Sequence, residues 1–170
     1  RKMIVELMLA NHPQECLTCA KNQKCELLAI AREMGIESVP FHGERRQRPI
    51  DDSSPSIIRD PEKCIICQRC MRVCHDIQSV GVLSASMRGW NTMIEPTLGT
   101  PLSEAVCVYC GQCINRCPTG ALTEKTYINE VWDAIADPNK FVVVQTAPAV
   151  RATIGEEFGM PPGTRVTHKM

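Results

Sequence analysis

The sequence is poor in aromatic residues, has no excess of charge of either sign and contains no long apolar run. Phe, Trp and Tyr make up 4% of its 170 residues, which excludes a core packed mainly by aromatic rings, so something else must help to hold small modules together. Lys and Arg number 19, as do Asp and Glu, so no basic surface for nucleic acid or lipid is predicted. No segment approaches the roughly 18 apolar residues of a spanning helix, and none reads as a signal peptide.

Cysteine, in contrast, is abundant, with 11 copies that fall into three groups. Two groups share the spacing C-x2-C-x2-C-x3-C, and the third has the spacing C-x2-C-x5-C with a histidine four residues before it. The groups are Cys64, Cys67, Cys70 and Cys74; Cys107, Cys110, Cys113 and Cys117; and His12 with Cys16, Cys19 and Cys25. No cysteine is left over, and the odd total argues against a complete disulfide framework.

The two longer runs have the spacing that holds [4Fe–4S] clusters. Thiolates are soft ligands that suit iron in sulfide surroundings, and two intervening residues let a tight loop point successive sulfurs into one pocket. The run is the bacterial ferredoxin signature, whose fourth cysteine ligates the other cluster. Pro118 follows the second run as in that signature, whereas His75 follows the first. We therefore assign Cys64, Cys67, Cys70 and Cys117 to one cluster, and Cys107, Cys110, Cys113 and Cys74 to a second.

The third group needs a fourth ligand, and His12 is the candidate beside its three cysteines. Histidine is a common metal ligand. A neutral imidazole in place of a thiolate makes the cluster one charge less negative and should raise its reduction potential, as histidine ligation does in Rieske centres. The other three histidines have no such partners and are expected at the surface or behind the ligands. They are His42, His75 and His168.

Two other uses of these cysteines fit the sequence less well. Each run could in principle bind one zinc ion, but structural zinc sites use two C-x2-C pairs and rarely add cysteines at the further spacings seen here. Disulfides at this density would imply a secreted protein. The sequence therefore predicts three [4Fe–4S] clusters in a cytoplasmic protein, with no membrane span, no nucleic-acid partner and no catalytic residue of its own.

The chain is expected to have an α+β fold in three parts, covering residues 1–45, 46–127 and 128–170. In the first, a helix ends at Ala10 before Asn11-His12-Pro13, and a second helix covers Glu26–Met34 and is closed by Gly35. The histidine and three cysteines thus lie on a loop between two helices.

The middle part is a ferredoxin-like internal repeat, because CIICQRCMRVC realigns on CVYCGQCINRC. Each half should form a short strand, a cysteine loop, a short helix and a second strand. We expect the second strands at Val80–Ser84 and Ala121–Glu124, and an insertion at Ser86–Glu104.

The last part begins a different pattern. Phe141–Val144 is a continuous apolar, β-branched run of the kind found in buried parallel strands. Thr146-Ala147-Pro148 then opens a helix that runs through Phe158 and stops at Gly159. This predicts the beginning of an incomplete α/β domain, and we expect both chain ends to be cut from a longer polypeptide.

The order of these parts resembles that of the catalytic subunits of [FeFe]-hydrogenases. The resemblance covers essentially the whole chain and is best to the longer, multi-cluster subunits of NAD(P)-linked, electron-bifurcating complexes. RKMIVELMLANHPQECLTCAKNQKCEL is similar to their His-ligated module, and TAPAVR through Gly159 is similar to the opening of their active-site domain. His168 stands where glycine is expected, and the active-site cysteines of the family are not among these residues.

The resemblance implies an electron relay to a di-iron H-cluster that reversibly reduces protons to hydrogen. It also implies a [2Fe–2S] domain in the parent subunit. The implied partners are a flavin- and iron–sulfur-bearing, NAD(P)H-oxidising subunit with a small [2Fe–2S] subunit, or ferredoxin. The alternatives are the iron–sulfur segment of an NAD-dependent formate dehydrogenase or of a respiratory NADH dehydrogenase large subunit, and a free polyferredoxin.

Overall fold

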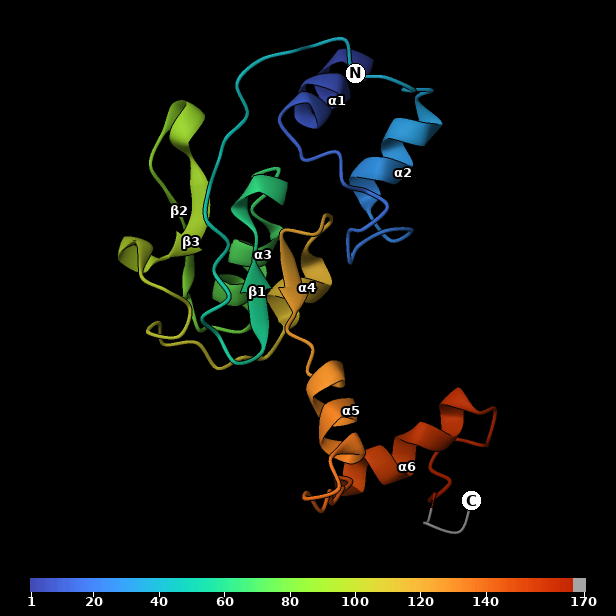
Figure 1. Cartoon of the computed structure of the whole chain (residues 1–170). Helices are drawn as coiled ribbons and strands as arrows, with labels where there is room; N and C mark the ends of the chain where they lie inside the picture. The colour runs from blue at the N-terminus through green and yellow to red at the C-terminus, as the bar shows by residue number, and fades with distance from the viewer. Residues whose placement is uncertain (167–170) are drawn as a thin grey trace. The chain divides into compact units, whose positions relative to one another are not determined.

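The computed structural model describes residues 1–166, which divide into two units, one spanning residues 1–126 and the other beginning at Tyr127. The first unit has the predicted α+β character, with short helices and two small sheets (Figure 1). None of the described helices is long and apolar enough to cross a bilayer.

Both sheets of the first unit are antiparallel pairs. Strand β1 (Ile57–Arg59) pairs with β4 (Leu122–Glu124), so the beginning and the end of the ferredoxin-like part lie side by side. Strand β2 (Leu83–Ser86) pairs with β3 (Met93–Pro96). Apolar side chains from all four strands form the core together with buried cysteines. These strands are too short to be stable alone, so this shared core, and any bound metal, must hold them together.

Short helices follow each cysteine loop. Helix α3 (Arg69–Arg72) continues into the π-helical turn η2 (Val73–Ile77), and α4 (Gln112–Arg116) follows the second loop. Three single 3₁₀ turns complete this part. They are η1 (Pro61–Lys63), η3 (Gly89–Asn91) and η4 (Thr97–Gly99).

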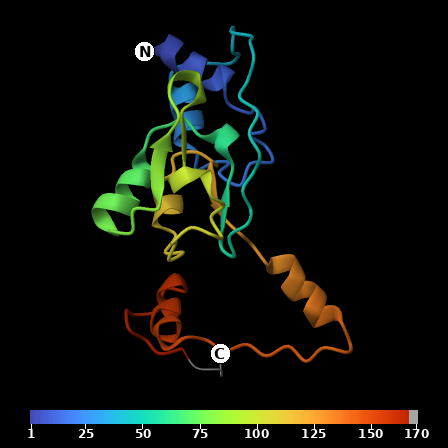
Figure 2. The same cartoon turned by 90° about the vertical axis from the view of Figure 1, so that its left-hand side faces the viewer.

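The His-bearing part is a pair of helices joined by a loop. Helix α1 (Lys2–Ala10) ends just before His12, and α2 (Glu26–Glu33) begins just after Cys25. Their contact buries Val5 against Leu27 and Ala31. Residues 37–56 then run in an extended path along the outside of the unit to β1, as the two views in Figures 1 and 2 show.

Most of the elements expected from the sequence form, with shifted ends. The second strand of the first half begins at Leu83 rather than Val80, because Gly81 at φ +69° turns the chain first. The segment predicted as an insertion, Ser86–Glu104, contains strand β3, which pairs with β2. That segment therefore supplies the missing strand of the second half.

The second unit contains helices α5 (Ile128–Ala136) and α6 (Pro148–Glu157), the latter close to its predicted range. The predicted buried strand at Phe141–Val144 is wrong, since no strand forms there and Phe141 and Val143 are 94% and 75% exposed. A parallel strand is stable only when neighbouring strands satisfy its backbone groups. The described residues of this unit supply no such neighbour.

Candidate iron–sulfur sites

The two cysteine loops adopt the same unusual backbone conformation at the same positions. The residue two places after the first cysteine has positive φ in both loops, as does the residue four places after it. These residues are Ile66 and Gln68 in the first loop, and Tyr109 and Gly111 in the second. A β-branched residue in this region is a genuine outlier that costs on the order of 1–3 kcal/mol. Such strain is typical of functional loops, and the two loops share it at equivalent positions.

One cavity collects cysteines from both runs. Cys64, Cys70 and Cys117 line it. Cys67 is exposed but lies within electrostatic reach, because its charge acts on Cys70. The pKa of Cys70 is raised to about 12, chiefly by burial and then by repulsion from the neighbouring thiol groups. The backbone N–H of Ile66 lies 3.4 Å from Cys64 Sγ and donates to it. We call this the Cys64 site.

A second cavity collects the remaining four cysteines of the two runs. Its walls include Cys74, Cys107, Cys110 and Cys113, with apolar Ile57, Val82 and Leu102 around them. The pKa of Cys113 is raised to about 11, chiefly by burial, with further repulsion from the other three thiols of this cavity. We call this the Cys107 site. In both cavities the fourth cysteine of one run lies with cysteines of the other run.

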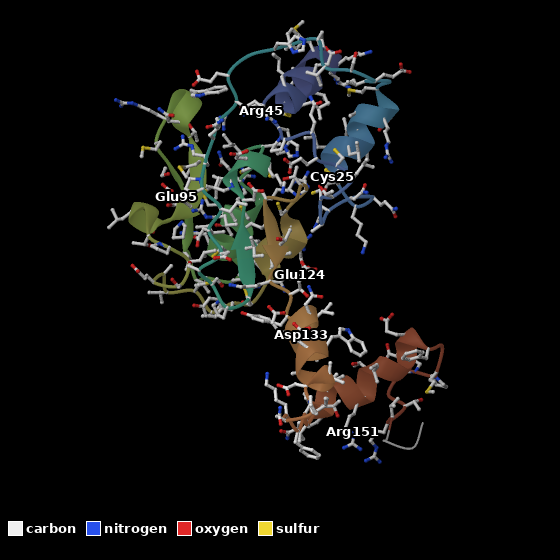
Figure 3. All side chains as sticks on the ribbon, viewed as in Figure 1. Cys25, Arg45, Glu95, Glu124, Asp133 and Arg151 are labelled. Carbon is white, nitrogen blue, oxygen red and sulfur yellow. The ribbon has the colours of Figure 1, made fainter. Side chains whose placement is uncertain are left out.

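A third cavity is lined by the histidine and all three cysteines of the N-terminal group: His12, Cys16, Cys19 and Cys25. Cys25 is the residue just before helix α2, and it lies where that helix approaches the ferredoxin-like part (Figure 3). His12 is 9% exposed, and its Nδ1 atom has no hydrogen-bond partner among the described residues. Burial, followed by the charge of Lys63, lowers the pKa of His12 and favours the neutral form that binds metal. We call this the His12 site.

The three donor sets fit iron–sulfur clusters. Each site offers soft sulfur donors in a partly apolar cavity. Buried thiols with raised pKa hold their protons until a metal displaces them. Within residues 1–166, no three His, Cys, Asp or Glu side chains converge closely enough to share a single ion.

Neither His42 nor His75 lines any of these sites. His42 is exposed, and His75 is exposed with its Nδ1 3.1 Å from Asp76 Oδ1. Their expected surface position is confirmed, whereas His168 lies outside the described residues.

Sequence reasoning did not find two residues that line the His12 site from the ferredoxin-like part, Lys63 and Gly120. Each is within three residues of a cysteine of the Cys64 site. The sequence shows that they lie near Cys64 and Cys117 along the chain. Cysteine spacing does not indicate, however, which cluster site such a flanking residue faces.

Two family models match the chain. Residues 1–40 match the iron–sulfur binding region of NADH-ubiquinone oxidoreductase G, and residues 54–123 match the ferredoxin-like domain of NADH-quinone oxidoreductase subunit 3. These segments are iron–sulfur domains of the NADH-quinone oxidoreductase G type. The G-type segments contain all the cysteines that line the three cavities.

Curated relatives extend the likeness to the whole chain. Subunit HndD of an NADP-reducing hydrogenase from Solidesulfovibrio fructosivorans is 49% identical over 170 residues, which are 100% of this chain and 29% of that protein. Iron hydrogenase 1 of Clostridium pasteurianum is 32% identical over 99% of this chain and 30% of that protein. Subunit alpha of an NADPH-Fe(3+) oxidoreductase from Geobacter sulfurreducens is 35% identical over 75% of this chain and 15% of its own length.

A solved structure, that of an NAD+-reducing [NiFe]-hydrogenase in the H2-reduced state, is similar in fold, with a TM-score of 0.70 and 28% identity. The match covers 74% of this chain and 54% of that one. By name, the relatives are oxidoreductases linked to hydrogen or to nicotinamide nucleotides. The chain spans less than a third of each of these three curated relatives.

Proposed function

We propose that this chain holds three [4Fe–4S] clusters and relays electrons to the active site of an [FeFe]-hydrogenase subunit. The observation that carries the proposal is the partition of ten of the eleven cysteines into three cavities, with Cys67 beside the first of them. Cys64, Cys67, Cys70 and Cys117 would hold one cluster, and Cys74, Cys107, Cys110 and Cys113 a second. His12, Cys16, Cys19 and Cys25 would hold the third. When bound, each cluster accepts and returns single electrons.

The protein supplies the ligands and the shielding of each centre. The two ferredoxin-type sites share walls, since Leu83 and Leu122 line both cavities. The His12 site shares Lys63 and Gly120 with the module that carries the other two. The three sites lie in one folded unit and are linked by these wall residues, which supports a relay between centres that are shielded by protein.

The hydrogenase assignment is favoured by the segment after residue 127. The likeness to HndD and to iron hydrogenase 1 continues through that segment, and no cysteine lies between Cys117 and Met170, where a formate dehydrogenase should carry another cysteine motif. The parent subunit would then also hold a [2Fe–2S] cluster and the di-iron H-cluster. It would work in the cytoplasm with a flavin-bearing NAD(P)H-oxidising subunit and a small [2Fe–2S] subunit, or with ferredoxin.

The second candidate is the iron–sulfur segment of a respiratory NADH dehydrogenase or formate dehydrogenase large subunit. The names of the two matching family models favour the NADH dehydrogenase form of this candidate. In that case the parent protein would show no hydrogen turnover.

Iron and sulfide analysis of the anaerobically purified parent protein tests the cluster part of the proposal. Variants Cys67→Ser and Cys110→Ser test the relay, one for each ferredoxin-type site. Hydrogen turnover with the physiological donor should be abolished in both, whereas turnover with a small dye that reaches the active site directly should partly survive. Equal loss in the two assays, with an intact di-iron centre, would contradict a relay. Stoichiometric zinc without sulfide would refute the clusters themselves.

A further inference from the structure

The His12 site abuts the Cys64 site through the segment that follows Cys117. The backbone N–H of Glu26, next to the ligand Cys25, donates to the carbonyl oxygen of Pro118 at 2.9 Å. The carboxylate of Glu26 also accepts from Arg69 Nη1, at 2.7 and 2.8 Å to its two oxygens. The start of helix α2 thus contacts the middle of the first cysteine run through Arg69 and the residue after the second run through Pro118.

Gly120 is the point of closest approach in this contact. A Cβ atom at this position would lie 2.8 Å from Cys19 Sγ, a separation at which real Cβ atoms are essentially never found, and 3.4 Å from Lys63 Cδ, which is near ordinary contact. The backbone of Gly120 does not have positive φ, so conformation alone would allow any residue. Glycine is needed here because a sulfur of the His12 site lies against the backbone.

The chain between Gly120 and the Cys64 site is short and buried. Thr119 is 1% exposed, and its hydroxyl donates to the carbonyl oxygen of Lys63 at 2.7 Å. The same hydroxyl oxygen lies 3.8 Å from Cys117 Sγ. Three covalently linked residues and one sulfur–backbone contact therefore join Cys117 to Cys19. No equivalent contact from the Cys107 site to the N-terminal group is found among the described residues that line these cavities.

We propose that Gly120 is a positioning residue that keeps the His12 site within electron-transfer contact of the Cys64 site, and that the electron crosses along Cys117–Gly120 to Cys19. The inference rests on the proposed function. In the step, the cluster at one site is oxidised by one electron and the cluster at the other is reduced by one. No bond forms or breaks and no proton is transferred. The His12 site would exchange electrons with the Cys107 site only by way of the Cys64 site.

The test is Gly120→Ala in the full-length protein, purified anaerobically. The readout is the magnetic interaction between the reduced His12 and Cys64 clusters in electron paramagnetic resonance spectra, with iron content measured alongside. The added methyl group should displace Cys19 and so weaken or abolish this interaction, and slow reduction of the Cys64 cluster by electrons entering at the His12 site. The matched control is Gly43→Ala, at a glycine with ordinary φ and no atom within 4 Å of an added Cβ, which should leave the interaction unchanged.

A Gly120→Ala variant with all its iron, an unchanged interaction and an unchanged rate would overturn the inference. If the methyl group instead releases the His12 cluster, Thr119→Val decides the question, since it removes the hydroxyl that fixes the segment to Lys63 without adding bulk near Cys19. A weakened interaction in that variant supports the contact, and an unchanged one overturns it. A wild-type protein without three clusters would refute the proposed function instead, which keeps the two failures distinct.

Discussion

The two cysteine runs have identical spacing, but the chain adopts different conformations at the last cysteine of each run. In the second run, Pro118 keeps the residue before it out of the helical region, so α4 ends at Arg116 and Cys117 is extended at φ −71° and ψ 120°. In the first run, His75 allows the helix to continue, and Cys74 lies inside η2. The fourth cysteine of one run thus lies in a helical turn, and that of the other lies on an extended segment.

This difference gives the two ferredoxin-type sites different neighbours. The extended segment after Cys117 carries Pro118 and Gly120 to the His-bearing part, where they contact Glu26 and Cys19. The chain after Cys74 turns instead at Ser79 and Gly81, both at positive φ, into strand β2. Two runs with the same cysteine spacing therefore form sites with different neighbours. The residue after the last cysteine, Pro118 or His75, determines the path of the chain that follows.

The largest expected effect comes from replacing the fourth cysteine of a run, which lies with the cysteines of the other run. Cys74→Ser should remove or damage the cluster of the Cys107 site, with a loss of up to about four of twelve irons, and should spare the Cys64 and His12 sites. Cys117→Ser is the matched variant and should damage the Cys64 site instead. Iron and sulfide analysis with electron paramagnetic resonance distinguishes the sites. Loss of the Cys64 cluster on mutation of Cys74 would show that each run serves its own cluster.

A smaller but selective effect is expected at the His12 site. His12→Cys should retain a four-iron cluster and lower its reduction potential by on the order of 100 mV, because a thiolate adds one negative charge that imidazole does not. His12→Ala should lose that cluster and leave the other two. Redox titration of the purified variants measures both outcomes. An unchanged potential in His12→Cys would mean that the imidazole is not a ligand.

Replacing Lys63 should change the reduction potential of the cluster at the His12 site by less than His12→Cys does. Lys63 lines the His12 site, and its ammonium group lies 2.8 Å from Asp60 Oδ2. A nearby positive charge stabilises the reduced form of a cluster. Lys63→Gln removes that charge and leaves Asp60 without its ion pair, so the potential should fall by on the order of tens of millivolts. Lys24→Gln, at an exposed lysine next to Cys25, is the control. Equal shifts in the two variants would show that the wall position of Lys63 does not matter.

The sequence was informative wherever a residue type has one dominant use. Cysteine spacing predicted which residues gather at the three cavities, because iron clusters require four ligands at fixed separations, and Gly35 and Pro13 marked helix ends because of their backbone restrictions. It could not predict β3, since strand pairing depends on which segments the folded chain brings together. The apolar run Phe141–Val144 was misread for the same reason, because β-branched composition predicts a strand only where other strands accept its hydrogen bonds.

Contacts between modules were also beyond the sequence. The need for glycine at position 120 arises from Cys19, a residue about a hundred positions earlier, and is not a requirement of local turn geometry. The role of Lys63 at the His12 site depends likewise on the packing of η1 against the N-terminal loop. Spacing rules describe the ligands of one cluster, whereas the arrangement of one cluster site against another depends on tertiary packing.

The smallest expected effect is a change in stability when the residues at the equivalent left-handed position of the two loops are replaced. Gln68 and Gly111 both precede a short helix, at φ 63° and 71°, and only glycine adopts this conformation without steric cost. Gly111→Gln should destabilise the protein by about 1 kcal/mol even though an added Cβ would meet no atom within 4 Å. Gln68→Gly should be neutral or stabilising by less than about 1 kcal/mol, because relief of strain is partly offset by the greater freedom of glycine in the unfolded chain. The measurement is the denaturant concentration at which cluster absorbance is lost under anaerobic conditions. Changes of opposite sign in the free energy of unfolding would show that both loops need the left-handed conformation and that Gln68 adopts it with strain. A destabilising Gln68→Gly would instead mean that the glutamine side chain makes a stabilising contact.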